Sequence, residues 1–266
     1  MEKVIHKTAI VDEHAEIAHG VEIGPYSIIG PNVKIGKNTK IRSHVVIEGW
    51  TTIGANCDIF QFASIGGIPQ DLKYVGEECY VVIGDNTTIR EYVTVNMGTA
   101  GGGKYTRVGS NCLLMACSHV AHDCLLGDGV ILANAALLAG HVTLEDYAIV
   151  GGGSAVHQFV KIGRNTMVGG MSRVIYDVPP YCILGGVPTV VVGLNLVGIK
   201  RAGFSEDTIK LLKQAFRLLY RSELTFSDAI EQIKKLQQVA EIKHFIDFLT
   251  SAERGIMRQR PTKSKI

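Results

Sequence analysis

A six-residue repeat runs through most of this sequence. Every sixth residue is Val, Leu or Ile from Val108 to Val174, and every sixth residue is Ile or Val from Ile5 to Ile65. In the second run the residue four places later is small, as at Cys112 and Ser118. An α-helix repeats every 3.6 residues and a strand every two, so a period of six requires short strands separated by corners. This pattern is typical of a parallel β-helix, in which three sides make a coil of about 18 residues.

The repeat is interrupted twice. Between Ile65 and Ile83 the aliphatic positions fall on Asp71 and Glu77, and a glycine-rich stretch precedes Val108. We therefore predict loops at 66–82 and 96–107. A long loop in a compact repeat protein is often functional, which we expect of the first one. We expect the second to be a plain flexible connection, because no helix follows its glycines to form a phosphate-binding turn.

The repeat gives way to a helical pattern near residue 190. We expect the β-helix to end at residues 177–180, DVPP, because proline cannot donate to a further rung. Ser205 precedes an amphipathic run, Thr225 with Asp228 resembles a capping box for a helix to about Leu236, and a third helix covers roughly 239–249. The sequence predicts a mainly β protein with a β-helix domain at 1–190 and a helical domain at 191–266.

Three histidines fall near one column of this β-helix. His122, His141 and His157 lie on consecutive coils, each within about one position of the same column. Successive coils are separated by roughly 4.8 Å. None of the three occupies an inward position. One histidine on a β surface is usually only solvated, but three in near alignment favour a functional site.

Composition limits the other possibilities. The net charge is +2, yet residues 1–190 carry 13 basic and 17 acidic side chains and residues 191–266 carry 14 and 8. The basic tail is either a solvated helical surface or a docking face for an acidic partner. Repeats that begin at Ile5 and the lack of a long apolar stretch predict a cytoplasmic protein without signal peptide or membrane span. Cys57, Cys112 and Cys124 occupy small inward positions, and no CxxC spacing suggests zinc or disulfides.

Five motifs occur in a characteristic order: QDLKY at 70–74, HVAHDC at 119–124, LAGHV at 138–142, AVHQF at 155–159 and DVPPY at 177–181. With them the chain resembles, over essentially its full length, the acyl-carrier-protein:UDP-N-acetylglucosamine O-acyltransferases, which catalyse the first step of lipid A synthesis in Gram-negative bacteria. The resemblance implies a left-handed β-helix homotrimer with active sites between subunits. It also implies transfer of an acyl chain, commonly 3-hydroxylated, from acyl carrier protein to the 3-hydroxyl of UDP-N-acetylglucosamine, with no metal, cofactor or nucleic acid.

The resemblance assigns roles to individual residues. His122 is the general base, which a weakly acidic sugar hydroxyl requires, and Asp123 orients it. The backbone N–H of Gly140, one full coil after His122, stabilises the oxyanion. Gly170 limits the acyl chain, and Gly152 lies one coil before it, so an open strip favours a long chain of about fourteen carbons. The residues implied to hold or line the sugar-nucleotide site are Asp71, Lys73, His141, His157, Gln158, Asn195 and Arg201.

Three positions depart from the family pattern: Val197 replaces a common acidic residue, Ala202 a common arginine and Asn96 a common histidine. These changes leave nucleotide contact and the preferred sugar open. The nearest alternative is an N-acyltransferase that acts on a 3-amino or already acylated UDP-sugar. A zinc carbonic anhydrase on the same fold would need three histidine ligands with another spacing, and a non-enzymatic scaffold would need neither the histidines nor the QDLKY loop.

Overall fold

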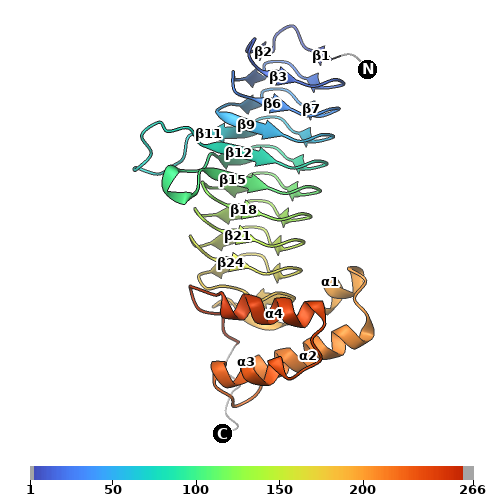
Figure 1. The fold of residues 1–266 in the computed structure, drawn as a ribbon. Helices are drawn as coiled ribbons and strands as arrows, with labels where there is room; N and C mark the ends of the chain where they lie inside the picture. The colour runs from blue at the N-terminus through green and yellow to red at the C-terminus, as the bar shows by residue number, and fades with distance from the viewer. Residues whose placement is uncertain (1–2, 260–266) are drawn as a thin grey trace.

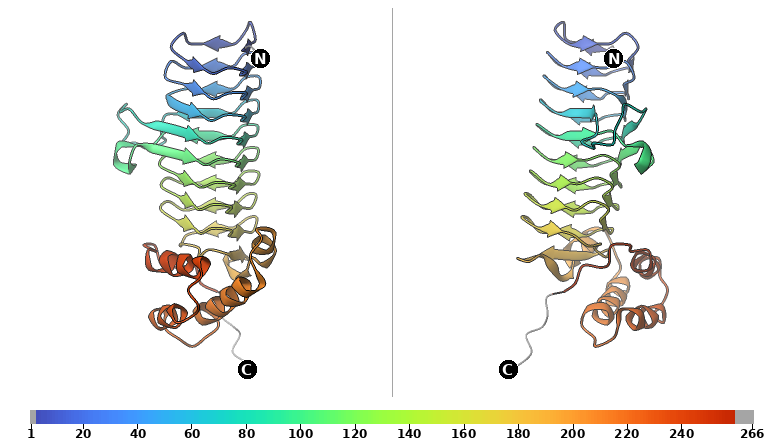
Figure 2. Two further views of the ribbon diagram at one scale, coloured as in Figure 1. Left: turned by 45° about the vertical axis from the view of Figure 1, so that its right-hand side comes forward. Right: turned by 90° about the vertical axis from the view of Figure 1, so that its left-hand side faces the viewer.

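The protein is an elongated prism of stacked coils with helices at one end. The computed structural model describes residues 3–259. Most of the described chain winds into a left-handed parallel β-helix, and the helices lie at its C-terminal end (Figure 1). Three sheets form the sides of the prism, as the turned views show (Figure 2). The predicted fold class is confirmed.

Each strand spans one side of a coil and usually contains two residues. Over the described residues, sheet A contains β1 (Val4–Ile5), β4 (Glu22–Ile23), β7 (Lys40–Ile41), β10 (Asp58–Ile59), β13 (Thr88–Ile89), β16 (Leu113–Leu114), β19 (Ile131–Leu132), β22 (Ile149–Val150), β25 (Met167–Val168), β27 (Cys182–Gly185) and β28 (Val190–Leu194). Sheet B contains β2 (Ile10–Val11), β5 (Ile28–Ile29), β8 (Val46–Ile47), β11 (Ser64–Gly67), β14 (Thr94–Asn96), β17 (His119–Val120), β20 (Leu137–Leu138), β23 (Ala155–Val156) and β26 (Arg173–Val174). Sheet C contains β3 (Glu16–Ile17), β6 (Lys34–Ile35), β9 (Trp50–Ile53), β12 (Tyr80–Ile83), β15 (Tyr105–Val108), β18 (Leu125–Leu126), β21 (Thr143–Leu144) and β24 (Lys161–Ile162).

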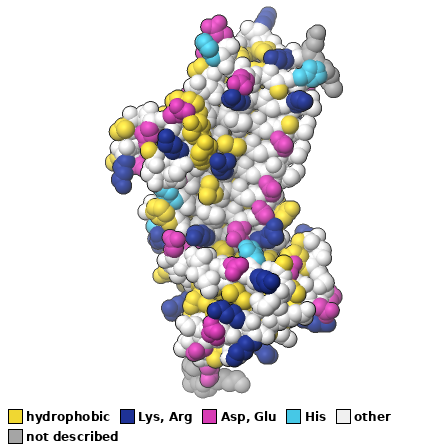
Figure 3. Space-filling view, viewed as in Figure 1, with side chains coloured by type: hydrophobic (Ala, Val, Ile, Leu, Met, Phe, Trp, Pro, Cys, Tyr) yellow, Lys and Arg dark blue, Asp and Glu magenta, His cyan; other side chains and the backbone are white. Residues whose placement is uncertain are grey.

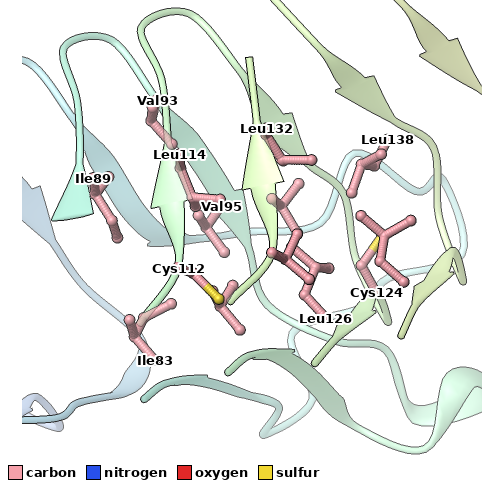
Figure 4. Close-up of a cluster of buried hydrophobic side chains, with 14 of the residues drawn as sticks. Ile83, Ile89, Val93, Val95, Cys112, Leu114, Cys124, Leu126, Leu132 and Leu138 are labelled. Carbon is pink, nitrogen blue, oxygen red and sulfur yellow. The ribbon is translucent and has the colours of Figure 1, made fainter. Parts of the chain in front are cut away.

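The register has the predicted coil length. Val120 pairs with Leu138, and Leu138 pairs with Val156, so each residue pairs with the one that lies a full predicted coil further along the chain. Where the loops leave the coil the pairing survives: Ile59 pairs with Ile89 across the first loop. The aliphatic and small positions fill the interior, where Ile, Leu, Val and Cys side chains from successive coils lie together (Figure 4).

The inward cysteines behave as core residues. Among the residues described, all six cysteines are free, and only Cys117 is exposed. Burial raises the pKa of the Cys112 thiol to about 11 and that of Cys124 to about 12, which keeps both protonated at neutral pH.

The corners place side chains in outward columns. Many residues three places after the inward aliphatic have positive φ, a conformation that only Gly, Asn and Asp adopt easily. The corner between sheets C and A meets this mostly with asparagines, whereas the other two corners carry other side chains, many of them large. The non-glycine positive-φ columns are Asn38, Asn56, Asn86, Asn111, Tyr147, Asn165 and Tyr181 between C and A, Tyr26, His44, Phe62, Tyr92, Cys117, Ala135 and Met171 between A and B, and Asp123, His141 and Phe159 between B and C.

Two loops project from the corner between sheets B and C. Strands β11 and β12 extend into the first predicted loop, so residues 68–79 lie outside the strands rather than 66–82. Strands β14 and β15 likewise leave 97–104 between them, with a short 3-10 helix, η1 (Ala100–Gly102). Both loops extend from the same side of the prism (Figure 1).

The β-helix does not end at the prolines, contrary to the prediction. Val178 bridges Ile162, and Leu184 of β27 pairs with Val168. The β-helix therefore makes one more turn, and this coil is two residues shorter than a regular coil. Proline is tolerated at position 179 because a backbone N–H there would pair only with a carbonyl of the following coil. Pro180 occupies the second corner position, and Gly140 at the equivalent position donates to no carbonyl among the described residues.

Four helices follow the hairpin of β27 and β28 in the described part of the chain. They are α1 (Leu196–Arg201), α2 (Glu206–Tyr220), α3 (Phe226–Lys234) and α4 (Ala240–Thr250). Thr225 caps α3 as predicted, Ser205 caps α2 at the start of the predicted amphipathic run, and α1 was not foreseen. The helices share their own apolar core, which includes Tyr181. The domain boundary stays a prediction, and β28 crosses residue 190. Within residues 3–259 no helix is long and apolar enough to cross a membrane.

Candidate active site

The candidate site is built at the corner between sheets B and C. His122 and Asp123 follow β17, Gly140 and His141 follow β20 one coil later, and Phe159 follows β23. Backbone bonds join these corners: the N–H of His141 donates to the carbonyl of His122 at 3.0 Å, and the N–H of Phe159 to that of Gly140 at 3.2 Å. The repeat therefore holds chemically distinct side chains in fixed neighbouring positions.

His122 and Asp123 form a hydrogen-bonded dyad. His122 Nδ1 lies 2.8 Å from Asp123 Oδ2, and the carboxylate side chain is fully buried while the imidazole is 15% exposed. An ionised carboxylate can only accept, so Nδ1 carries the proton and donates it. That tautomer leaves the lone pair on Nε2 free to take a proton from a substrate.

Gly140 lies directly against the His122 ring, as the offset of one coil predicted. A Cβ on Gly140 would lie 2.5 Å from His122 Cε1 and 2.6 Å from Nε2, far inside contact distance. The neighbouring amides of Ala139 and His141 donate to backbone carbonyls, but within residues 3–259 no acceptor is found for the Gly140 N–H. A backbone N–H without an acceptor in this part of the chain thus belongs to a residue that lies directly against the His122 ring, and it is available to donate to a substrate oxygen.

The glycine-rich loop 97–104 is not the plain flexible connection we expected. Thr99 caps η1 and donates both its N–H, at 2.8 Å, and its hydroxyl, at 2.7 Å, to the Asp123 carboxylate. Gly102 lies over the same carboxylate. The loop therefore covers Asp123 and excludes water from it. Nothing in the sequence indicated this contact, because Thr99 lies in a loop that does not follow the six-residue repeat.

A groove of about 700 Å³ connects the two loops to the histidine column. It is lined by Asp71, Lys73, Thr99, His141 and Phe159, together with their neighbours Tyr74, Val75, Glu77, Ala100, Gly101 and Gly102. Three of the residues implied by the resemblance, Asp71, Lys73 and His141, are thus brought together. Burial lowers the pKa of His141, although the Asp123 carboxylate opposes this, so His141 is favoured in its neutral form at neutral pH.

The third histidine is not in the column. His141 stacks on Phe159, with ring centroids 4.4 Å apart, while His157 is exposed and its Nδ1 lies 3.2 Å from the Gln158 carbonyl. The spacing from His141 falls short of a full coil and moves His157 two positions back along the side, so the predicted alignment of three histidines was wrong. Phe159 was missed, although its full-coil offset from His141 marked it. His122 and His141 do meet, edge to face at 5.1 Å.

Asn195 and Arg201 line a different groove. Together with Arg164 and Asn165 they border a space of about 580 Å³ at the corner between sheets C and A. Asn195 is 5% exposed, caps α1 by accepting from the Gly198 N–H, and donates to the Asn165 carbonyl at 2.8 Å. Its amide therefore has a structural role whatever else it binds. Arg201 is exposed in the last turn of α1.

Gly152 and Gly170 stack at the corner between sheets A and B, as expected from their spacing. A Cβ on Gly170 would lie 3.2 Å from the Gly152 carbonyl oxygen, and one on Gly152 would lie 3.1 Å from that of Asn134. Neither glycine has a positive φ, so the turn itself does not require them. Met171 beside them is 79% exposed. His122, the Arg201 groove and this strip of glycines thus occupy three different edges of one prism.

A metal ion is the other ligand that the histidines suggest. Donor atoms of His122, Asp123 and His141 all lie within 4.8 Å of one another. Both Asp123 oxygens, however, already accept hydrogen bonds from Thr99 and His122. A cation would have to displace these bonds, so the donor set fits a proton-transfer dyad better than a metal centre.

Comparison with known proteins decides the family. A profile of Udp N-acetylglucosamine O-acyltransferase, domain 2, matches residues 177–257, and a bacterial transferase hexapeptide profile of six repeats matches residues 2–37. An enzyme of Paracidovorax citrulli named acyl-[acyl-carrier-protein]--UDP-N-acetylglucosamine O-acyltransferase is 54% identical over 259 residues, covering 96% of this chain and 99% of the relative. The chain belongs to this acyltransferase family.

Solved structures of the family agree. LpxA from Acinetobacter baumannii is 49% identical, with a TM-score of 0.93 over 96% of this chain and 100% of that one. The UDP-N-acetylglucosamine acyltransferase of Francisella novicida is 40% identical, with a TM-score of 0.94 over 97% and 95% of the two chains. The acyltransferase fold therefore extends over essentially the whole molecule.

Proposed function

We propose that this protein transfers an acyl chain from acyl carrier protein to the 3-hydroxyl of UDP-N-acetylglucosamine, the first step of lipid A synthesis, with His122 as general base. The observation that carries the proposal is the His122–Asp123 dyad with the Gly140 amide beside it. The alternative of an amide-forming N-acyltransferase is not favoured, because the relatives are named as O-acyltransferases. The reaction is cytoplasmic in this proposal.

The dyad supports a simple sequence of proton transfers. His122 Nε2 takes the proton of the sugar 3-hydroxyl as its oxygen attacks the thioester carbonyl. The negative charge that develops on the carbonyl oxygen is stabilised by the Gly140 N–H. When the tetrahedral intermediate collapses, the carbon–sulfur bond breaks and the thiolate of the carrier takes the proton from His122. Asp123 stabilises the imidazolium throughout and stays ionised.

The sugar nucleotide and the acyl chain require more than one subunit in this proposal. Asp71, Lys73 and His141 hold the nucleotide at one edge, and the family resemblance assigns Gln158 and His157 to the same site. Arg201 with Asn195 and the Gly170 strip lie at other edges of the same prism. A homotrimer with closed symmetry brings edges of different subunits together. The loop 68–79 supports this assembly: Leu72 is fully exposed and Val75 is 89% exposed, which suits a surface that packs against a neighbour.

The basic helical unit suits an acidic carrier. Lys213 and Arg217 are exposed four residues apart on α2, and several Lys and Arg side chains lie on this unit in Figure 3. Long-range attraction to acyl carrier protein would accelerate the encounter and weaken with salt.

Two inactive variants test the base and the shared site together. His122→Ala should lower kcat by about 10²- to 10⁴-fold, with trimer mass and nucleotide binding unchanged. Arg201→Ala should lose activity at low UDP-N-acetylglucosamine. If each site takes the two residues from different subunits, trimers refolded from an equal mixture should recover up to roughly a quarter of parent activity. Product mass spectrometry identifies the ester. Parent turnover in His122→Ala, or a monomeric active enzyme by light scattering, would contradict the proposal.

A further inference from the structure

We infer that Thr99 is a positioning residue of the dyad and that the glycine-rich loop 97–104 exists to bring it onto Asp123. The inference rests on the proposed function, because it concerns how the base is oriented. Asp123 has a fully buried side chain and cannot touch a substrate, so whatever fixes its carboxylate acts on the chemistry through His122.

The hydrogen bonds at Thr99 have a defined direction. The Gly102 N–H donates to Thr99 Oγ1 at 3.2 Å, which occupies the hydroxyl as an acceptor. Its own proton is then directed to Asp123 Oδ2, 2.7 Å away, while the Thr99 N–H donates to Oδ1 at 2.8 Å. One residue thus contacts both oxygens of the carboxylate. This fixes the plane of the carboxylate and presents Oδ2 to His122.

The backbone of Asp123 is held from the opposite side. Its N–H donates to Thr106 Oγ1 at 2.8 Å, and Thr106 is fully buried in β15. Asp123 therefore has its amide fixed by the β-helix and its carboxylate fixed by the loop. His141, whose Nε2 lies 3.8 Å from Oδ2, is too distant to replace the Thr99 hydroxyl.

The contact with Asp123 explains why residue 102 of this loop is glycine. A Cβ on Gly102 would lie 2.1 Å from Asp123 Cγ and 2.3 and 2.4 Å from its two oxygens. Asp123 could move away only by breaking the hydrogen bonds that hold it to Thr99, His122 and Thr106. Gly101, one residue earlier, would meet nothing within 4 Å and has no positive φ. Close approach to the carboxylate therefore requires glycine at 102 and not at 101.

The loop also connects to the groove that holds the nucleotide. The Ala100 N–H lies 3.3 Å from Glu77 Oε1, and Glu77 belongs to the loop that carries Asp71 and Lys73. This contact steadies the far side of η1 without touching Asp123. Because Ala100 contacts Glu77 and not Asp123, a substitution there would not test the orientation of the carboxylate. Substitutions of Thr99 and Gly102 would.

The experiment compares matched pairs in the full-length enzyme. Thr99→Val removes the hydroxyl but keeps the shape and the backbone donor, and we expect kcat to fall about tenfold with an unchanged KM for UDP-N-acetylglucosamine. Thr99→Ser, which restores the hydroxyl, should recover most of that loss. Gly102→Ala should lower kcat at least as much as Thr99→Val and more than Gly101→Ala does, because a Cβ at position 101 meets nothing within 4 Å.

The outcomes separate the two proposals. Parent kcat in Thr99→Val, or equal effects of Ala at 101 and 102, with His122→Ala still inactive, would overturn the positioning role and leave the proposed function standing. Activity that survives in His122→Ala would overturn the proposed function itself. If Thr99→Val does not fold, as judged by its thermal unfolding and oligomer mass, the Gly101 and Gly102 pair decides.

Discussion

Replacing Gly140 by alanine should disable catalysis while leaving the fold intact. The added Cβ would lie 2.5 Å from His122 Cε1, whereas ordinary contact begins at 3.4 Å, so the ring must retreat by about 0.9 Å. The ring is not free to do so without breaking the 2.8 Å bond to Asp123. A displacement of roughly 1 Å in a reacting group costs on the order of 10²-fold in rate, and we expect kcat to fall by about that factor.

The backbone should tolerate the change, because Gly140 does not have a positive φ. The unfolding midpoint and the oligomer mass should therefore match the parent. Gly30→Ala is the control: its Cβ would first meet Glu48 Cα at 3.4 Å, an ordinary contact, and it should keep parent kcat. Initial rates with saturating acyl carrier protein thioester and saturating nucleotide measure the chemical step. A Gly140→Ala enzyme within about threefold of the parent would refute the argument that this glycine makes room for the base.

Three further outcomes follow from other parts of the molecule. Gly170→Met should shift donor preference from about fourteen carbons towards ten, since each methylene no longer accommodated forfeits roughly 0.8 kcal/mol; an unchanged chain-length profile would rule out a ruler at this position. Lys213→Glu with Arg217→Glu should raise the KM for the acyl carrier protein donor and flatten its dependence on salt, which parent-like salt dependence would contradict. Burial lowers the pKa of His119 from 6.5, so the unfolded chain binds the extra proton first and the free energy of unfolding falls as pH drops through about 6.5. His119→Gln should flatten that decline in a series of denaturation curves between pH 7.5 and 5, and an identical decline would show that other groups cause it.

The juxtaposition of His122 and Gly140 could be anticipated because the coil converts sequence spacing into distance, whereas their proposed roles came from the family resemblance. An offset of one full coil placed Gly140 beside His122, and the same offset stacked Gly152 with Gly170. The error over His157 has the same cause. Its spacing from His141 was accepted as near enough to a coil, but two positions along a strand carry a side chain several ångströms away from the column.

The end of the β-helix was mispredicted for a local reason. Two prolines normally stop a sheet, and no property of the sequence distinguishes a proline in a rung from one at a corner whose amide is not needed. The continuation through β27 depends on a shortened coil, which breaks the period that the prediction relied on. Helix α1 was missed because its six residues are too short for an amphipathic pattern.

The sequence by itself determined what repeats: the coil length, the inward aliphatic and small positions, the places where two loops leave the coil, and the caps of α2 and α3. Each of these depends on neighbours along the chain or on a constant offset. Only the tertiary structure decided what the loops do. Thr99 reaches Asp123, and Gly102 must be glycine, because a loop without a period folds back over a corner that comes a full coil later in the chain. Such a contact is set by the path of the loop in space, and no regular spacing encodes it.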